Sequence, residues 1–173
     1  MSSYLDGSDS DEEVSKSVDP EIAAVATEKS KASKAVADAA FGAKDFEGAA
    51  AAYTQAINDL KEVGLPKSSV LLANRSASYL ALKRYVPACH DAMQSAEADP
   101  TNWKAHWRQG VAIMAMSQRK FRSKQAIDAF TKCRDCSSLP ENKKSEVANG
   151  LAMAQARLKA QDDATPMPDM SDC

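Results

Sequence analysis

Residues 74–110 read NRSASYLALKRYVPACHDAMQSAEADPTNWKAHWRQG, and this stretch decides the fold. Ala88, Ala92 and Ser95 stand at offsets of 0, +4 and +7, so they share one face of a helix. Ser76 lies upstream on a preceding helix, and the Asp99-Pro100 pair closes the segment that carries the offsets. Because small side chains let two helices approach closely, the stretch predicts a pair of packed helices.

The same offsets recur before and after this stretch. They are occupied by Ala49, Tyr53 and Ala56 in the first unit and by Ala126, Phe130 and Cys133 in the third. A small residue also precedes each set, and these residues are Ala37, Ser76 and Gly110. Such repetition predicts an all-α repeat protein. The expected helices cover residues 20–43, 46–62, 67–82, 85–98, 102–116 and 122–137, with a capping helix over 140–161.

Composition agrees with a helical protein. The chain has 173 residues with 32 alanines, few glycines and prolines, and 6% aromatic residues, which disfavours a β-sandwich or barrel. No apolar run approaches the ~18 residues that a membrane span requires. The first residues, MSSYLDGSDSDEEV, are acidic where a signal peptide would be basic and then apolar. We therefore expect a cytoplasmic protein, whose four cysteines fit a reducing compartment.

Charge divides the chain into three parts. Residues 1–18 are rich in serine and acids, and residues 162–173 contain four aspartates and no base, so we expect two disordered acidic tails. The folded domain is expected over residues 19–161. Residues 22–161 carry a net charge of +8, which predicts an anionic partner for the body. Nucleic acid, acidic lipid and acidic peptide remain open from charge alone.

The repeated pattern resembles the tetratricopeptide repeat, a helix-turn-helix unit of 34 residues. This resemblance implies three repeats in a right-handed superhelix, followed by the capping helix. The units here are 39 and 38 residues apart, so the resemblance implies insertions around residues 61–69 and 117–124.

Four residues on the first helices of the three units resemble the carboxylate clamp of co-chaperone repeat domains. These residues are Lys34, Asn74, Lys104 and Arg108. Such domains hold the Glu-Glu-Val-Asp terminus of the heat-shock chaperones of the seventy- and ninety-kilodalton classes. Cations and an amide suit paired carboxylates, and we expect Lys104 and Arg108 to face solvent. The resemblance implies a monomeric protein-interaction module, not an enzyme, with an acidic peptide as partner and with neither nucleic acid nor membrane as ligand.

Asp38 departs from this pattern, because the clamp has an asparagine at that position. An aspartate there would repel the carboxylates of the ligand, or would form an i,i+4 pair with Lys34. The alternative interpretation is a repeat scaffold that binds a different protein segment because Asp38 breaks the clamp.

Cys133 and Cys136 form a CxxC motif, which can serve a thiol oxidoreductase or form half of a zinc site. Cys133 also occupies the small-residue offset of its helix, and the other cysteines and histidines are scattered along the chain. We therefore expect a packing role for the pair. The sequence predicts no catalytic residue, no metal and no cofactor.

Overall fold

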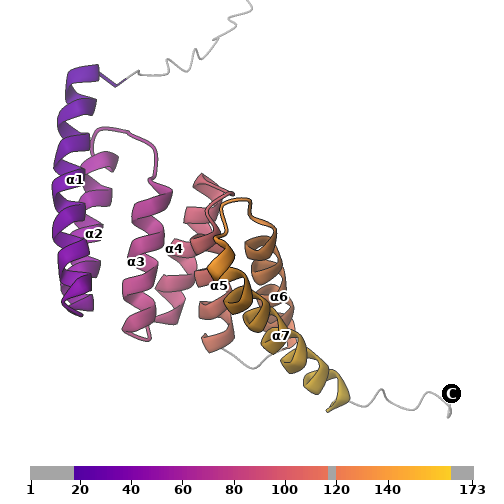
Figure 1. The fold of residues 1–173 in the computed structure, drawn as a ribbon. Helices are drawn as coiled ribbons and strands as arrows, with labels where there is room; N and C mark the ends of the chain where they lie inside the picture. The colour runs from indigo at the N-terminus through magenta and orange to yellow at the C-terminus, as the bar shows by residue number, and fades with distance from the viewer. Residues whose placement is uncertain (1–17, 117–119, 165–173) are drawn as a thin grey trace, which may run out of the picture.

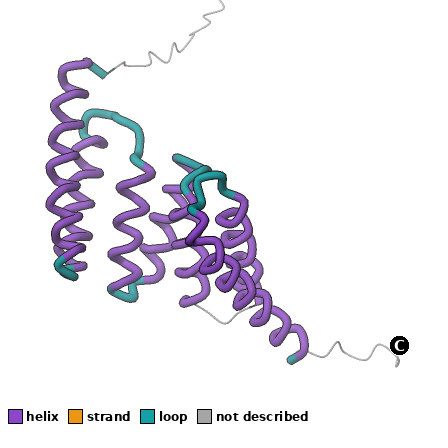
Figure 2. The backbone as a smooth tube through the Cα atoms, viewed as in Figure 1, coloured by secondary structure: helices purple, strands orange, loops and turns teal. Residues whose placement is uncertain are grey.

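The computed structural model describes residues 18–116 and 120–164, and within these ranges the chain is helical with no strand (Figures 1 and 2). The helices are α1 (Pro20–Gly42), α2 (Phe46–Lys61), α3 (Ser69–Ala81), α4 (Tyr85–Ala98), α5 (Trp103–Met116), α6 (Lys120–Asp135) and α7 (Glu141–Asp163). The expected all-α architecture is confirmed. It consists of three helix pairs and a seventh helix.

Two of the expected helices have ends that differ from the structure by two residues. The third helix begins at Ser69 instead of residue 67, because the side chain of Ser68 accepts a hydrogen bond from the Leu71 amide and caps the helix there. The sixth helix covers Lys120–Asp135 instead of residues 122–137. Part of the insertion expected around residues 117–124 is therefore helical.

The last helix is longer than expected. It continues to Asp163, so residues 162 and 163 belong to α7 and not to a tail. The amide of Ala164 still donates to the carbonyl of Ala160, and Ser123 of α6 donates to the side chain of Gln161 at 3.0 Å. Most of the two expected tails, residues 1–17 and 165–173, lies outside the described residues. The limits proposed for the three parts of the chain stay a prediction.

The turns inside the first two helix pairs have the same geometry. Lys44 and Lys83 adopt positive φ angles of 63° and 57°. Each donates its amide to a carbonyl three residues back, at Phe41 and Leu80 respectively. These left-handed residues reverse the chain directly after a helix. The equivalent turns confirm that the two units repeat one structure.

The core consists of the small residues that the sequence repeats. All nine residues at the repeated offsets are at most 3% exposed. Ala37 and Ser76 are 0% exposed, and Gly110 is also buried. Hydrogen bonds join the helices of a pair at the same place, because Ser30 donates to the Ala56 carbonyl and Ser95 donates to the Ser69 carbonyl, both at 2.8 Å.

The helices stack in chain order, each against the next, as Figure 1 shows. The first helices of neighbouring units also meet, because α3 contacts α5 and α5 contacts α7. At the carboxyl end α7 covers the aromatic pair Trp107 and Phe130, whose ring centroids lie 5.2 Å apart. The residues of α7 that are buried are Val147, Leu151 and Ala154. This helix therefore covers the last apolar face.

Gly110 allows α5 and α6 to approach closely. A Cβ atom built at Gly110 would lie 2.5 Å from the ring of Phe130, which is 2% exposed and cannot easily move. We expect Gly110→Ala to lower the free energy of unfolding by about 1–3 kcal/mol, although alanine favours a helix. Urea denaturation measures this change.

Gly42→Ala is the matched control, because a Cβ atom at Gly42 has no neighbour within 4 Å. It should leave the midpoint of unfolding nearly unchanged or raise it. Equal stability of the two variants would contradict the close contact between Gly110 and Phe130.

Candidate functional site

Two adjoining cavities lie along α1, α3 and α5, the first helices of the three pairs. The first, of about 300 Å³, is lined by Asp38, Phe41, Gly42, Tyr53, Asn74, Ala77 and Arg108. The second, of about 470 Å³, is lined by Lys34, Val70, Ala73, Asn74, Asp99, Thr101, Asn102, Trp103, Lys104 and Ser138. Because Asn74 lines both, we call the two cavities together the groove. All five residues selected from the sequence therefore lie in the groove.

Arg108 is a partly buried cation for which the described residues provide no ion pair. Its Nη1 atom is buried and has no hydrogen-bond partner among the described residues. Burial lowers the pKa of the guanidinium to about 10, and the neighbouring Tyr53 opposes this change. The expectation that Arg108 faces solvent was wrong, because α5 directs the guanidinium inward between its neighbours. A buried charged donor without an acceptor costs stability, so this position is suited to an anion.

Asp38 is engaged by two side chains of its own domain. Lys34 donates from Nζ to one carboxylate oxygen, and the Tyr53 hydroxyl donates to the other, both at 2.5 Å. Partial burial would raise the pKa of Asp38, but these hydrogen bonds outweigh it, and the pKa lies below its usual value. The expected pair between Lys34 and Asp38 is thus present. Both side chains are more than a third exposed, at 35% and 45%, so the pair adds little stability.

Tyr53 is a groove residue that the sequence analysis had assigned only to the core. Its residue is 3% exposed, yet its hydroxyl reaches the groove. Burial and the Asp38 charge raise the pKa of the phenol, whereas Asn74 and Arg108 act in the opposite direction. The sequence did contain a sign of this role. Tyr53 carries a hydroxyl group, whereas the equivalent positions hold Ala92 and Phe130, which have no polar group.

Lys104 lines the second cavity of the groove, whereas Asp38 lines the first. It is exposed, as expected, and its Nζ lies 5.9 Å from the centroid of the Trp103 ring. Its backbone amide donates to the side chain of Asn102 at 3.2 Å, which caps the start of α5. Asn74 stands between the two cavities and supplies an amide without adding charge. The groove therefore offers three cations, Lys34, Lys104 and Arg108. They lie beside two aspartates, Asp38 and Asp99, whose carboxylates already accept hydrogen bonds within the domain.

The thiols of the CxxC motif do not have the environment of reactive cysteines. Cys133 is 0% exposed, and burial raises its pKa to about 12. Burial and the charges of Asp135 and Asp99 also raise the pKa of Cys136. Redox-active and metal-binding thiols need a lowered pKa instead. The expected packing role is confirmed for Cys133.

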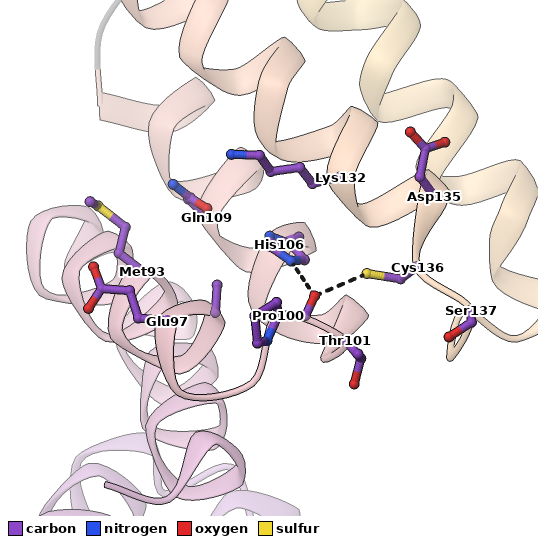
Figure 3. A pocket seen from close by; sticks show the side chains of 11 residues that line it. Met93, Glu97, Pro100, Thr101, His106, Gln109, Lys132, Asp135, Cys136 and Ser137 are labelled. Carbon is purple, nitrogen blue, oxygen red and sulfur yellow. Dashed lines mark hydrogen bonds between the residues drawn. The ribbon is translucent and has the colours of Figure 1, made fainter.

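A larger cavity of about 640 Å³ lies between α4 and α6, outside the groove (Figure 3). Its charged lining includes the exposed Glu97, and also Lys132 and Asp135, which pair with Asp128 and Arg134 at 2.8 Å. Among the described residues, the lysine of this cavity is therefore already paired, whereas Arg108 of the groove has an unpartnered Nη1.

The described residues contain no group of three or more histidine, cysteine, aspartate or glutamate side chains that could hold a metal ion. Among the helices described, none has the length and hydropathy needed to cross a membrane.

Curated proteins of similar sequence include the following two relatives. The chain is 31% identical over 116 residues to small glutamine-rich tetratricopeptide repeat-containing protein 2 of Saccharomyces cerevisiae, covering 67% of this chain and 31% of that protein. It is 38% identical over 82 residues to the rice protein SGT1 homolog, covering 47% of this chain and 21% of that protein. The chain thus spans less than a third of the length of these relatives. No family model matches the sequence.

Solved structures share the fold. The tetratricopeptide-repeat domain of Sgt2 from Aspergillus fumigatus superposes with a TM-score of 0.64 at 26% identity, covering 83% of this chain and 89% of that one. The first such domain of RPAP3, bound to the HSP90 peptide SRMEEVD, gives 0.66 at 20% identity, with 77% and 95% covered. The TPR2B domain of yeast Sti1, in complex with an Hsp70 peptide, gives 0.61 at 22% identity, with 78% and 98% covered. The helices from Pro20 to Asp163 therefore form a tetratricopeptide-repeat domain with three repeats and one further helix.

Proposed function

We propose that the groove binds an acidic peptide that ends in a free carboxylate, and that its partners are heat-shock chaperones of the seventy- and ninety-kilodalton classes. Lys34, Asn74, Lys104 and Arg108 would contact the peptide. The observation that carries this proposal is the buried Nη1 of Arg108, which has no acceptor in the described part of the domain.

The chemistry of the groove supports a carboxylate over other ligands. A terminal carboxylate has two acceptor oxygens, which match the forked donors of a guanidinium. Asn74 can donate to a ligand in either cavity, and Lys104 is exposed in the second cavity. The acceptor would compensate a charge that folding has already desolvated, so the binding free energy need not include that cost again.

The comparisons support the same class of partner. Two domains of the same fold are bound to chaperone peptides, one from HSP90 and one from Hsp70. Their sequence identities to this chain are 20% and 22%, so the likeness alone concerns the fold. The positions and charges of the groove residues in this chain supply the rest of the argument.

Asp38 favours a second candidate, a scaffold for a different protein segment. Its carboxylate lines the same cavity as Arg108 and would repel a ligand carboxylate placed there. It also holds Lys34, which could otherwise reach the ligand. A ligand with a basic or amide group near its end could form an ion pair or a hydrogen bond with the carboxylate of Asp38.

Removing either cation tests the proposal. A peptide ending in Glu-Glu-Val-Asp should bind the intact domain and should lose affinity when its terminus is amidated. Arg108→Ala should weaken binding by about 2–5 kcal/mol, because it leaves a desolvated carboxylate unpaired. Lys104→Ala should weaken binding less, and its effect should shrink with salt because Lys104 is exposed. Isothermal titration calorimetry measures both.

Lys132→Ala is the matched control, because Lys132 is an exposed lysine of α6 outside the groove. Its affinity and salt dependence should equal those of the original domain. Unchanged affinity in both groove variants would contradict the proposal that Arg108 and Lys104 bind the terminal carboxylate.

Neutralising Asp38 gives a second test with the opposite sign. Asp38→Asn retains an oxygen that accepts from Tyr53, releases Lys34 and removes one like charge. Affinity for the same peptide should rise by about three- to tenfold, which corresponds to about 0.5–1.5 kcal/mol. The gain should decrease as the salt concentration rises, because screening already weakens the repulsion. Titrations at low and high salt measure it.

The other outcomes are also informative. Weaker binding by Asp38→Asn would favour the second candidate, in which Asp38 contacts the ligand. An unchanged affinity would mean that α1 does not reach the peptide.

A further inference from the structure

The turn between α4 and α5 brings Lys104 to the groove. Thr101, Asn102, Trp103 and Lys104 are consecutive in the chain, and all four line the second cavity. Lys104 is the second residue of α5, so any movement of the turn moves its ammonium group. A flexible lysine binds a carboxylate well only if its backbone is held in place.

Two thiols hold this turn by its carbonyl oxygens. Cys133 donates from Sγ to the carbonyl of Trp103 at 3.3 Å. Cys136 donates from Sγ to the carbonyl of Pro100 at 3.7 Å (Figure 3). Both cysteines belong to the end of α6 and the residue after it, and neither lines the groove. They therefore contact the turn without lining the groove.

Two other side chains complete the attachment. Ser138 donates its hydroxyl to the carbonyl of Thr101. His106 Nε2 contacts the carbonyl of Pro100 at 2.9 Å, and because a carbonyl only accepts, this nitrogen must carry the proton (Figure 3). Ser138 lines the groove itself, so its effect on a ligand would be partly direct. Cys133 and Cys136 do not line the groove, so an effect of these residues on binding would come from positioning the turn and not from contact with the ligand.

The second repeat shows what this position does in the fold. Ser95 stands at the same offset as Cys133, and its hydroxyl donates to the carbonyl of Ser69 at the start of α3. Cys133 makes the corresponding bond to the start of α5. Cys136 then adds a second donor three residues later. Cys133 thus makes the same kind of hydrogen bond between helices as Ser95 in the second repeat, and Cys136 adds one more.

We propose that Cys133 and Cys136 are positioning residues for the peptide groove, which hold the turn before α5 so that Lys104 faces the terminal carboxylate. This inference rests on the proposed function. The thiols act as hydrogen-bond donors, so they must stay protonated. Burial raises the pKa of Cys133 to about 12, and the pKa of Cys136 is also raised, which keeps both protons in place near neutral pH.

The test is a double-mutant cycle in the full chain. Cys133→Ala with Cys136→Ala removes both donors, and Lys104→Ala removes the group that they position. Binding of the Glu-Glu-Val-Asp peptide is measured with its terminus free and amidated. Amide hydrogen exchange is measured at Thr101, Asn102 and Lys104, whose amides bond within the turn.

We expect the cysteine pair variant to bind the free-carboxylate peptide about three- to fivefold more weakly and to exchange faster at the turn. In the Lys104→Ala background the same substitutions should have no further effect on affinity, because the group that they position is gone. A general loss of packing would weaken binding in both backgrounds.

Two further variants separate position from stability. Cys89→Ala alters a buried cysteine of α4 that contacts the main core and not the turn, so it should leave binding and exchange at the turn unchanged. Cys133→Ser keeps a donor, as Ser95 does in the second repeat, and should retain full affinity.

Equal affinity of the cysteine pair variant and the original protein would overturn the inference while the proposed function stands. Additive losses in the Lys104→Ala background would also overturn it. If the original protein does not distinguish the free from the amidated peptide, the proposed function itself fails, and the exchange rates still report whether the thiols hold the turn.

Discussion

The close approach of the two helices in each pair is the constraint on which the rest of the structure depends. Gly110 has almost no space beyond its own backbone, because Phe130 lies against it. Two residues before it, on the same helix, stands Arg108. Residues two apart in an α-helix point about 200° away from each other, so fixing Gly110 against α6 directs Arg108 to the groove. Asn74 and Ser76 have the same relationship on α3.

Periodicity made the fold predictable from the sequence. Small residues at constant offsets define which face of each helix is buried, and this face is a local property of the chain. Helix ends were harder to predict, because they depend on single capping interactions such as that of Ser68. The length of α7 depends in part on a contact between Ser123 and Gln161, which are distant in the sequence.

The groove was predictable only in part. The resemblance to the carboxylate clamp selected Lys34, Asn74, Lys104 and Arg108, and the pair of Lys34 with Asp38 followed from their separation on one helix. The burial of Arg108 and the bond between Tyr53 and Asp38 were not predictable. The bond of Tyr53 to Asp38 depends on how closely α1 and α2 approach, and the burial of Arg108 depends on the helices around α5. A single sequence without an alignment contains no measure of that distance.

The position of α7 has a consequence for synthesis of the chain. The first two helix pairs end at Ala98, so both have left the ribosome before the third pair is complete. The aromatic pair Trp107 and Phe130 is covered only by the later helix, through residues around Gly150. Until that helix emerges, the third pair exposes an apolar face of the kind that promotes aggregation in partly made chains. The third repeat therefore stays incompletely covered until α7 has been synthesised.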